Sequence, residues 1–381
     1  MGDVAKLKKK KKTRSYVAGL FDVHERHSTL TVLGDPLVGL NAMIDWEAFR
    51  GDIEKARENA RETARKSAAG AKPIDAVLMF KILVLQQLNN LSDDRIEYQI
   101  RDRLSFMRFL ELNLEDRVPD AKTVWLFRET LKQQGVAEGL FKRFDGQLSA
   151  QGLIAKGGQM IDATFVEVPK SRNSREDNVK LKAGELPEGW DKEDPATEHM
   201  RCQKDTDARW TKKNQETHFG YKNHINADAQ NKLIRAYAVS AASVHDSQVF
   251  DQLLDQSTDD EGKKRAAYAD SAYRSKEQEE RLQANGIESQ VCEKGTRGTP
   301  LSEEQKAANR VKSKTRSRVE HVFGAQAQMG GHLVRTIGMA RARVKIAMMN
   351  LAYNMRRFVL LCRREIQAAN GFDRRGASAA A

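Results

Sequence analysis

The chain has few of the residues that build disulfide scaffolds, fibrous repeats or membrane spans. Its 381 residues include only three cysteines, Cys202, Cys292 and Cys362. Their wide separation excludes a disulfide framework and a cysteine-based zinc site, and it favours a reducing compartment. With 7 prolines and 25 glycines, the chain is neither collagen-like nor of low complexity throughout. No apolar run reaches the roughly 18 residues of a transmembrane helix, so we expect no membrane partner.

Several functional motifs are also missing. The phosphate-binding loop, the GxGxxG fingerprint and the HExxH zinc motif are absent, so nucleotide-driven and zincin chemistry have no support. The basic N-terminus is not followed by an apolar segment, so we expect no secretory signal and a cytoplasmic location. What is present is positive charge: 65 Lys and Arg against 53 Asp and Glu give a net charge of +12. This excess indicates a polyanionic partner.

The N-terminal part divides into a basic tail and arm, residues 1–34, and a mostly helical region, residues 35–152. Seven of the nine residues in 6–14 are basic, and they serve either as phosphate contacts or as a solvated tail. Helix starts are predicted at Asp35-Pro36, Pro73, Ser92 and Pro119-Asp120, because these residues cap or open helices. Short helices in a basic protein suggest a helix-turn-helix DNA-binding domain, although a plain helical bundle has the same composition.

The pattern changes after Gly157-Gly158 to alternating strands and helices. The order implies a mixed α/β domain over 153–368, followed by a C-terminal tail, 369–381. We expect strands over 159–169, in a hairpin over 218–242, over 266–270 and over 287–293, and helices over 245–254, 275–285 and much of 302–368. Residues 170–217 are polar and form a predicted insertion, either partly disordered or a lid. Its Trp190 and Trp210 either stack on bases or fasten the insertion to the body.

Three acidic residues stand out by their surroundings. Asp162 lies inside an apolar strand, where an unpaired carboxylate is costly. Asp270 ends the next buried strand, where α/β sheets carry ligand-binding residues. Glu320 is the single acid between positions 305 and 364, among fourteen Lys and Arg. Each has an ordinary alternative: Asp162 pairs with a lysine, Asp270 caps a helix, or Glu320 bridges to Arg316 one turn back.

Taken together, these carboxylates favour a metal centre. Oxygen ligands on separate elements suit hard divalent cations. Two such ions, about 3.5–4 Å apart, stabilise the attacking and leaving oxygens of a phosphoryl transfer. A row of alternating cations precedes Glu320, and we interpret it as a phosphate-binding surface, with a solvated basic helix as the alternative. The row consists of Arg310, Lys312, Lys314, Arg316 and Arg318.

Three further features have ordinary structural interpretations. Asp246 precedes a predicted helix, so we expect it to be the N-cap, with a supporting position near the metals as the alternative. His321 is expected to be structural. An apolar helix face is expected to belong to the core; it consists of Met348, Met349, Leu351, Met355, Phe358 and Val359.

The ordered segments resemble a bacterial insertion-sequence transposase of the DDE class, nearest the large IS-five group. The segments that carry this resemblance are 21–50, 91–131, IDATFVEVP (161–169), HFGYKNHINAD (218–228), 245–250, YADSAYRS (268–275) and NRVKSKTRSRVEHVFG (309–324). The resemblance implies a ribonuclease-H-like catalytic domain that holds two Mg²⁺, or Mn²⁺, on Asp162, Asp270 and Glu320. It also implies a homodimer that acts on terminal inverted repeats and target DNA near the bacterial nucleoid. Arg316 fits the pattern of related families around the Glu, but Ser313 and Ala327 stand where those families have a Tyr and a Lys, so the resemblance does not extend to the detailed contacts with DNA ends or to a hairpin intermediate.

Two other functions are compatible with the same sequence features. A metal-dependent nuclease on this fold would cut DNA without joining it. A DNA-binding regulator with a decayed catalytic domain would do neither, although the intact acidic trio argues against it.

Overall fold

The structure is a computed structural model. It describes residues 21–64, 72–155, 157–170, 173–188, 190, 202–213, 215–256, 262, 265–295 and 298–379. The basic run 6–14 and, within the predicted insertion, residues 171–172, 189, 191–201 and 214 lie outside these residues. No helix in the described part of the chain has the length and apolar character needed to cross a bilayer.

The N-terminal part is helical, as the sequence predicts. Its helices are α1 (Asp22–Val32), α2 (Pro36–Met43), η1 (Glu47–Phe49), α3 (Arg50–Ala64), α4 (Ala76–Leu88), α5 (Asp93–Asp102), α6 (Leu104–Leu110), α7 (Ala121–Gln133) and α8 (Ala137–Ala150). The predicted caps at Asp35, Ser92 and Asp120 each accept a hydrogen bond from a backbone N–H in the first turn. The predicted start at Pro73 is wrong. Asp75 caps α4 instead, because its carboxylate accepts from the backbone N–H of Leu78.

A mixed five-stranded sheet follows. Its strands are β1 (Gln159–Glu167), β2 (Arg209–Lys213), β3 (Glu216–Asp228), β4 (Ile234–Ala241) and β5 (Ala267–Tyr268). The long strand β3 pairs antiparallel with β1, β2 and β4, whereas β1 and β5 are parallel. The remaining helices are α9 (Arg175–Ala183), η2 (Asp246–Gln248), α11 (Phe250–Leu253), η3 (Ser271–Tyr273), α12 (Lys276–Ala284), α13 (Glu303–Arg316), η4 (Ser317–Val319), α14 (Glu320–Gln328) and α15 (Met339–Ala379).

Three predicted elements differ from the structure. Residues 287–293 form no strand but only an isolated bridge from Ser289 to Ala267, because β5 offers just two residues for pairing. The helix expected over 245–254 is divided into η2 and α11. The polar insertion is shorter than 170–217, since β2 and the start of β3 lie inside that range and pair with each other.

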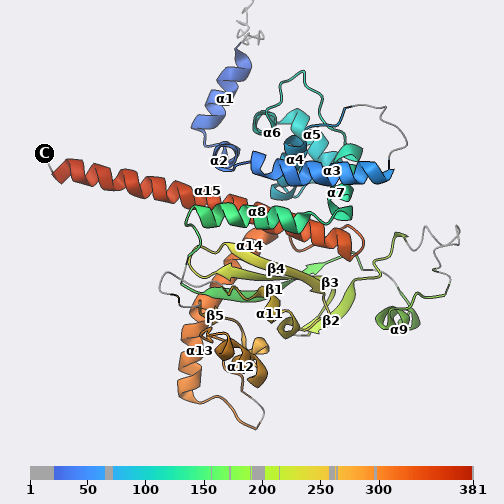
Figure 1. Cartoon of the computed structure of the whole chain (residues 1–381), viewed down its shortest axis with the longest axis vertical. Coiled ribbons are helices and arrows are strands. Elements are labelled where there is room, and N and C mark those ends of the chain that lie inside the picture. The colour runs from blue at the N-terminus through green and yellow to red at the C-terminus, as the bar shows by residue number, and fades with distance from the viewer. Residues whose placement is uncertain are drawn as a thin grey trace, which may run out of the picture.

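The helix α15 joins the two halves of the molecule. It runs between the N-terminal helices and the sheet (Figure 1) and packs against α2, α4, α7, α8 and β4. The predicted core face from Met348 to Val359 is buried. One hydrophobic core takes in side chains of the N-terminal helices, of α15 and of one sheet face, including Met160 and Ile225. The predicted boundary at residue 152 therefore separates segments of the chain that share this core.

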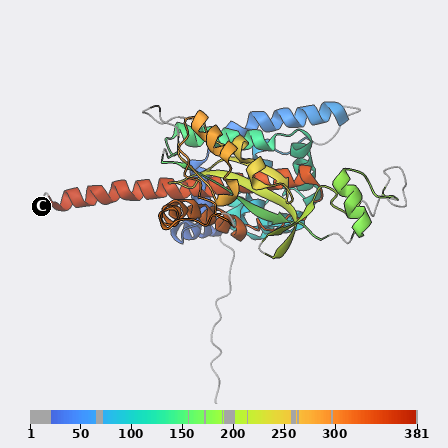
Figure 2. The same cartoon turned by 90° about the horizontal axis from the view of Figure 1, so that it is seen from below.

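The opposite face of the sheet has a smaller core of its own. There Ile161 packs with residues of α11 and α12, such as Phe250 and Leu282. Because neighbouring strand residues point to opposite faces, Met160 and Ile161 contribute to different cores. Seen from below, α15 projects beyond the body on one side and α9 lies at the other (Figure 2).

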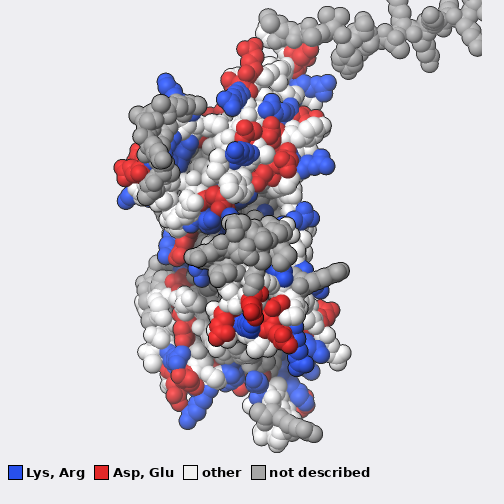
Figure 3. Space-filling model, turned by 90° about the vertical axis from the view of Figure 1, so that its right-hand side faces the viewer, with Lys and Arg blue, Asp and Glu red and all other residues white. Residues whose placement is uncertain are grey.

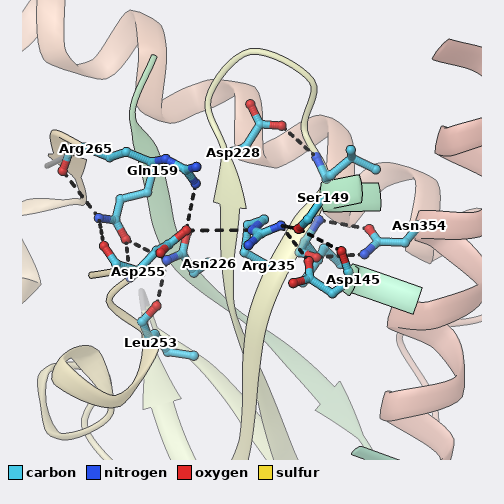
Figure 4. Close-up of polar contacts among 12 residues, drawn as sticks. Asp145, Ser149, Gln159, Asn226, Asp228, Arg235, Leu253, Asp255, Arg265 and Asn354 are labelled. Atoms are coloured by element: carbon cyan, nitrogen blue, oxygen red, sulfur yellow. Dashed lines mark hydrogen bonds and ion pairs between the residues drawn. The ribbon is translucent and has the colours of Figure 1, made fainter. Parts of the chain in front are cut away.

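A polar network ties α8 to the sheet (Figure 4). Arg235 on β4 places Nη1 2.8 Å from Asp145 Oδ1 of α8 and Nε 3.7 Å from Asp255 Oδ2. Arg265 lies 2.7 Å from the same oxygen of Asp255. Burial raises the pKa of Asp145 to about 6, because Arg235 only partly offsets the loss of hydration. The network fixes how the N-terminal helices sit on the sheet.

Candidate active site

Asp162 occupies the middle of β1, and its side chain is only 14% exposed. One oxygen, Oδ1, accepts a 2.8 Å hydrogen bond from the backbone N–H of Ala163, and Oδ2 accepts a 3.0 Å bond from Arg316 Nη1. Burial raises its pKa to about 6 in spite of these two contacts, and the nearby charge of Asp270 adds to the rise. Asp162 is thus a carboxylate that needs positive charge to stay ionised.

Asp270 lies two residues beyond β5, at the start of η3. Its Oδ1 accepts a 2.8 Å hydrogen bond from the backbone N–H of Ala272, so it does cap a short helix, as the ordinary alternative expects. The pKa of the buried Tyr273 hydroxyl is raised, mainly by burial. The negative charges of three carboxylates add to this rise: Asp162, Asp246 and Asp270. Asp162 and Asp270 therefore lie within electrostatic reach of each other and of Tyr273.

Glu320 is the first residue of α14, and its side chain is 68% exposed. Its Oε1 lies 4.0 Å from Nη2 of Arg316, the residue one turn earlier. The same guanidinium donates to Asp162. The short helix η4 separates α13 from α14 and makes contact with β1. Asp162 and Glu320 therefore lie on the same side of the molecule, joined through Arg316.

The chemistry of these oxygen donors suits a hard divalent cation, and the two aspartates fit one best. A cation would replace the positive charge that the buried Asp162 requires and would screen it from Asp270. Glu320 is held towards Arg316 instead, and among the described residues no group of three or more His, Cys, Asp or Glu side chains gathers closely enough to hold a metal. Arg316 acts as the counter-charge between Asp162 and Glu320 in this arrangement.

The predicted row of cations is on a helix, so its members point in different directions. Lys312 Nζ donates to the Val291 carbonyl at 3.0 Å and lies 3.5 Å from Glu293. Arg316 faces Asp162, and Arg318 Nη1 donates to the Ala229 carbonyl at 3.1 Å. Arg310 and Lys314 are exposed. The row therefore forms no single basic face, and Arg310 and Lys314 project into solvent.

The predicted N-cap role of Asp246 is wrong. His245 caps η2, because its ring nitrogen accepts from the backbone N–H of Ser247. Asp246 instead accepts a 2.8 Å hydrogen bond from Lys222 Nζ on β3. This places a paired carboxylate beside Tyr273, next to Asp162 and Asp270. No local pattern predicts Lys222 as the partner of Asp246, since the two residues meet only after β3 and β4 pair.

The remaining single-residue predictions have mixed outcomes. Trp210 lies on β2 with its ring 4.8 Å from that of Phe219, which confirms that it fastens this segment to the sheet. Trp190 is buried, with Lys204 Nζ 4.1 Å from its ring centroid. His321 is exposed, and it lines a groove beside Glu320.

The sheet order, with acidic residues on β1, after β5 and at the start of a late helix, defines a ribonuclease-H-like mixed-sheet domain preceded by a helical region. Residues 155–355 match the family model described as Transposase DDE domain, and residues 24–130 match Transposase domain (DUF772). The first match covers more than half of the chain, so the chain belongs to the DDE transposase domain family. The predicted resemblance to DDE transposases is confirmed, and the IS-five grouping stays a prediction.

One solved structure that resembles the chain is a piggyBac transposase synaptic complex with hairpin DNA. Its TM-score is 0.45, with 13% sequence identity, and the match covers 84% of this chain and 74% of that chain.

Proposed function

We propose that the protein is a transposase that cuts DNA at the ends of an insertion sequence and joins the freed 3′ ends to target DNA. Asp162, Asp270 and Glu320 are the catalytic carboxylates in this proposal and hold two Mg²⁺ ions, which Mn²⁺ can replace. The main observation in support of this proposal is that the Arg316 guanidinium contacts both Asp162 and Glu320. Asp162 and Arg316 are 154 positions apart in the chain, so the fold brings them together. The match to the DDE transposase domain family supports it.

The chain's own residues prepare this site in two ways. Backbone N–H groups of Ala163 and Ala272 each hold one oxygen of the neighbouring aspartate, which fixes the orientation of both carboxylates. Burial raises the pKa of Asp162, and the Ala163 N–H and the Arg316 guanidinium offset only part of this rise, so a bound cation would favour the ionised carboxylate. When bound, divalent ions would activate the attacking oxygen and stabilise the leaving oxygen at the scissile phosphate.

The substrates and assembly follow from the same proposal. The helical region 35–152 recognises terminal inverted repeats, and a homodimer pairs two ends before the target is joined. The protein then acts on chromosomal DNA in the bacterial cytoplasm. The positive net charge of +12 supports a DNA partner, and so does the match to the DDE transposase domain family.

The test removes one carboxylate at a time. Asp162→Asn, Asp270→Asn and Glu320→Gln should each bind DNA ends much as the unaltered protein does and should lose Mg²⁺-dependent cleavage, measured on a labelled donor duplex. Asp94→Asn on α5 and Glu303→Gln on α13, both exposed, are matched controls that should cleave normally. Full cleavage by any of the first three variants contradicts the proposed triad.

The DNA products of the reaction distinguish a transposase from the alternative, a nuclease. A transposase acting on a donor with inverted-repeat ends gives strand-transfer products joined to target DNA. Cleavage without end preference and without joined products favours a nuclease, and end binding without any Mg²⁺-dependent cleavage favours a regulator.

A further inference from the structure

A groove of about 810 Å³ lies between the N-terminal helices and α15, away from the two aspartates. Its walls come from α2, α6 and α15, and its far end reaches α14 and the turn between β3 and β4. The cations that line it are Arg103, Lys232, Arg356, Arg357, Arg363 and Arg364. Among the described side chains, Asp35 is the one carboxylate in the lining, and it is already paired with Arg108.

The groove cations lack acidic partners. Within the described ranges, none of the six forms an ion pair with a carboxylate. Burial and the nearby Arg357, Arg318 and Arg364 lower the pKa of Lys232. Mutual repulsion of this kind is unfavourable in the free protein, and an anion bound in the groove would relieve it.

The floor of the groove is held in place by hydrogen bonds to the β3–β4 turn. Arg318 Nη1 donates to the Ala229 carbonyl at 3.1 Å, Arg357 Nε to the Asn231 carbonyl at 2.7 Å, and the Tyr353 hydroxyl to the Lys232 carbonyl at 2.7 Å. Lys232 itself has a left-handed backbone, with φ of 59°. The turn is therefore fixed before any ligand arrives, and it carries the Lys232 side chain at the groove.

The groove is continuous with the surface around Glu320. His321 and Ala325 line both this groove and a second depression of about 440 Å³, whose lining includes Glu320. A linear polyanion in the groove would therefore pass next to the acidic residue of α14. On the face in Figure 3, by contrast, Asp and Glu lie among the Lys and Arg side chains.

The spacing of the cations suits a repeating anion. Arg356 and Arg363, and likewise Arg357 and Arg364, are seven residues apart on one helix. Seven residues rise about 10 Å along an α-helix, which is roughly the rise of three base pairs of duplex DNA. The repeated Arg-Arg pairs of RRFVLLCRR were a signal for this surface in the sequence, and only the packing of α15 against α2 shows that they line a groove.

We infer that the groove between α2, α6 and α15 binds the sugar-phosphate backbone of duplex DNA that extends away from Glu320. This inference rests on the proposed function and adds a DNA-contacting surface outside the acidic residues and outside the row 310–318. Its contacts are to phosphates, so they contribute affinity and register without sequence preference.

The experiment measures how binding of a mixed-sequence duplex depends on salt concentration, without divalent metal. A double variant, Lys232→Gln with Arg364→Gln, removes two groove charges, and Lys276→Gln with Arg281→Gln removes two exposed charges of α12, outside the region 35–152, as the matched control. The slope of log K against log[salt] is negative, and each lost phosphate contact reduces its magnitude by about 0.9. The groove variant should therefore lose about 1.8 from the slope, and the control should keep the slope of the unaltered protein.

The outcomes separate this inference from the proposed function. If the unaltered protein binds duplex DNA and the groove variant keeps its slope, the inference fails and the proposed function stands. If the unaltered protein binds no duplex, the proposed function fails as well. Unfolding curves of both double variants show whether a lost slope reflects lost folding, and the single variant Arg364→Gln, at an exposed position, provides the same test with an expected loss of about 0.9.

Discussion

The basic helices α13 and α15 differ in what their positive charges contact. On α13, Lys312 and Arg316 point back into the protein, towards Glu293 and Asp162. On α15, Arg357 donates to a backbone carbonyl, and Arg364 lies exposed at the groove. Lys312 and Arg316 of α13 therefore hold acidic residues of the sheet domain, whereas the groove cations of α15 form no ion pair and only Arg341, near the start of α15, pairs with a carboxylate, that of Glu129, among the described residues. A high density of Lys and Arg in a sequence therefore does not tell where free positive charge lies.

The largest expected effect on the free energy of unfolding concerns Arg316, a cation of α13 that is paired with a buried carboxylate. Arg316→Ala leaves the carboxylate of Asp162 buried without its partner, and removing one member of such a pair costs about 3 kcal/mol. We expect the free energy of unfolding, measured with urea, to fall by that amount, and Arg316→Lys to recover part of it. A loss within the ~0.5 kcal/mol typical of surface substitutions would show that the pair contributes little to folding.

Arg235 extends the comparison to a second cation held inside the molecule. The pKa of its partner Asp145 is raised from 3.8 to about 6 in the folded chain. Between these values the folded state binds more protons than the unfolded state, so lowering the pH stabilises the folded state through this group. Relative to Asp145→Asn, the unaltered protein should gain on the order of 2 kcal/mol between about pH 7 and about pH 4.

Chemical denaturation of both proteins across this range measures that difference. A stability difference between the two that stays constant with pH would mean that the folded pKa of Asp145 is close to its ordinary value.

A smaller effect is expected for the second paired cation of α13. Lys312 is 15% exposed and lies 3.5 Å from Glu293, which is 25% exposed. Lys312→Ala should lower the free energy of unfolding by about 1 kcal/mol, since partly exposed ion pairs contribute little. A double-mutant cycle with Glu293→Gln isolates the pair, and a coupling energy of zero would assign the loss to the hydrogen bond with the Val291 carbonyl.

The smallest effect is expected for the free cations. Arg364→Ala on α15 removes a side chain that no carboxylate holds, so the free energy of unfolding should change by less than about 0.5 kcal/mol. The same urea titration used for Arg316→Ala measures it. A destabilisation as large as that of Arg316→Ala would remove the contrast between the two helices.

Local features of the fold were predictable from the sequence because they depend on neighbouring residues. Asp35, Ser92 and Asp120 cap their helices as expected, since capping needs only a side-chain oxygen and the first turn. The strand around Asp162 was predictable from its β-rich apolar run. By contrast, RWTKK of β2 lacks an apolar pattern, and its place in the sheet depends on pairing with β3.

The candidate site was predictable only in its residue types. The unusual settings of Asp162, Asp270 and Glu320 singled them out, but the role of Arg316 between two of them requires α13 and η4 to lie against β1. The partner of Asp246 depends likewise on the approach of β3. Contacts of this kind join residues far apart in the chain, and no local spacing encodes them.

The sequence by itself determined the helix caps at Asp35, Ser92 and Asp120, the strand that carries Asp162, the apolar face of α15 and the excess of positive charge. Only the tertiary structure decided which cations are neutralised and which remain free, and that α15 shares one core with both the helices and the sheet. The physical reason is that capping and periodicity act within a few residues, whereas ion pairing and burial depend on distances in space that packing alone sets.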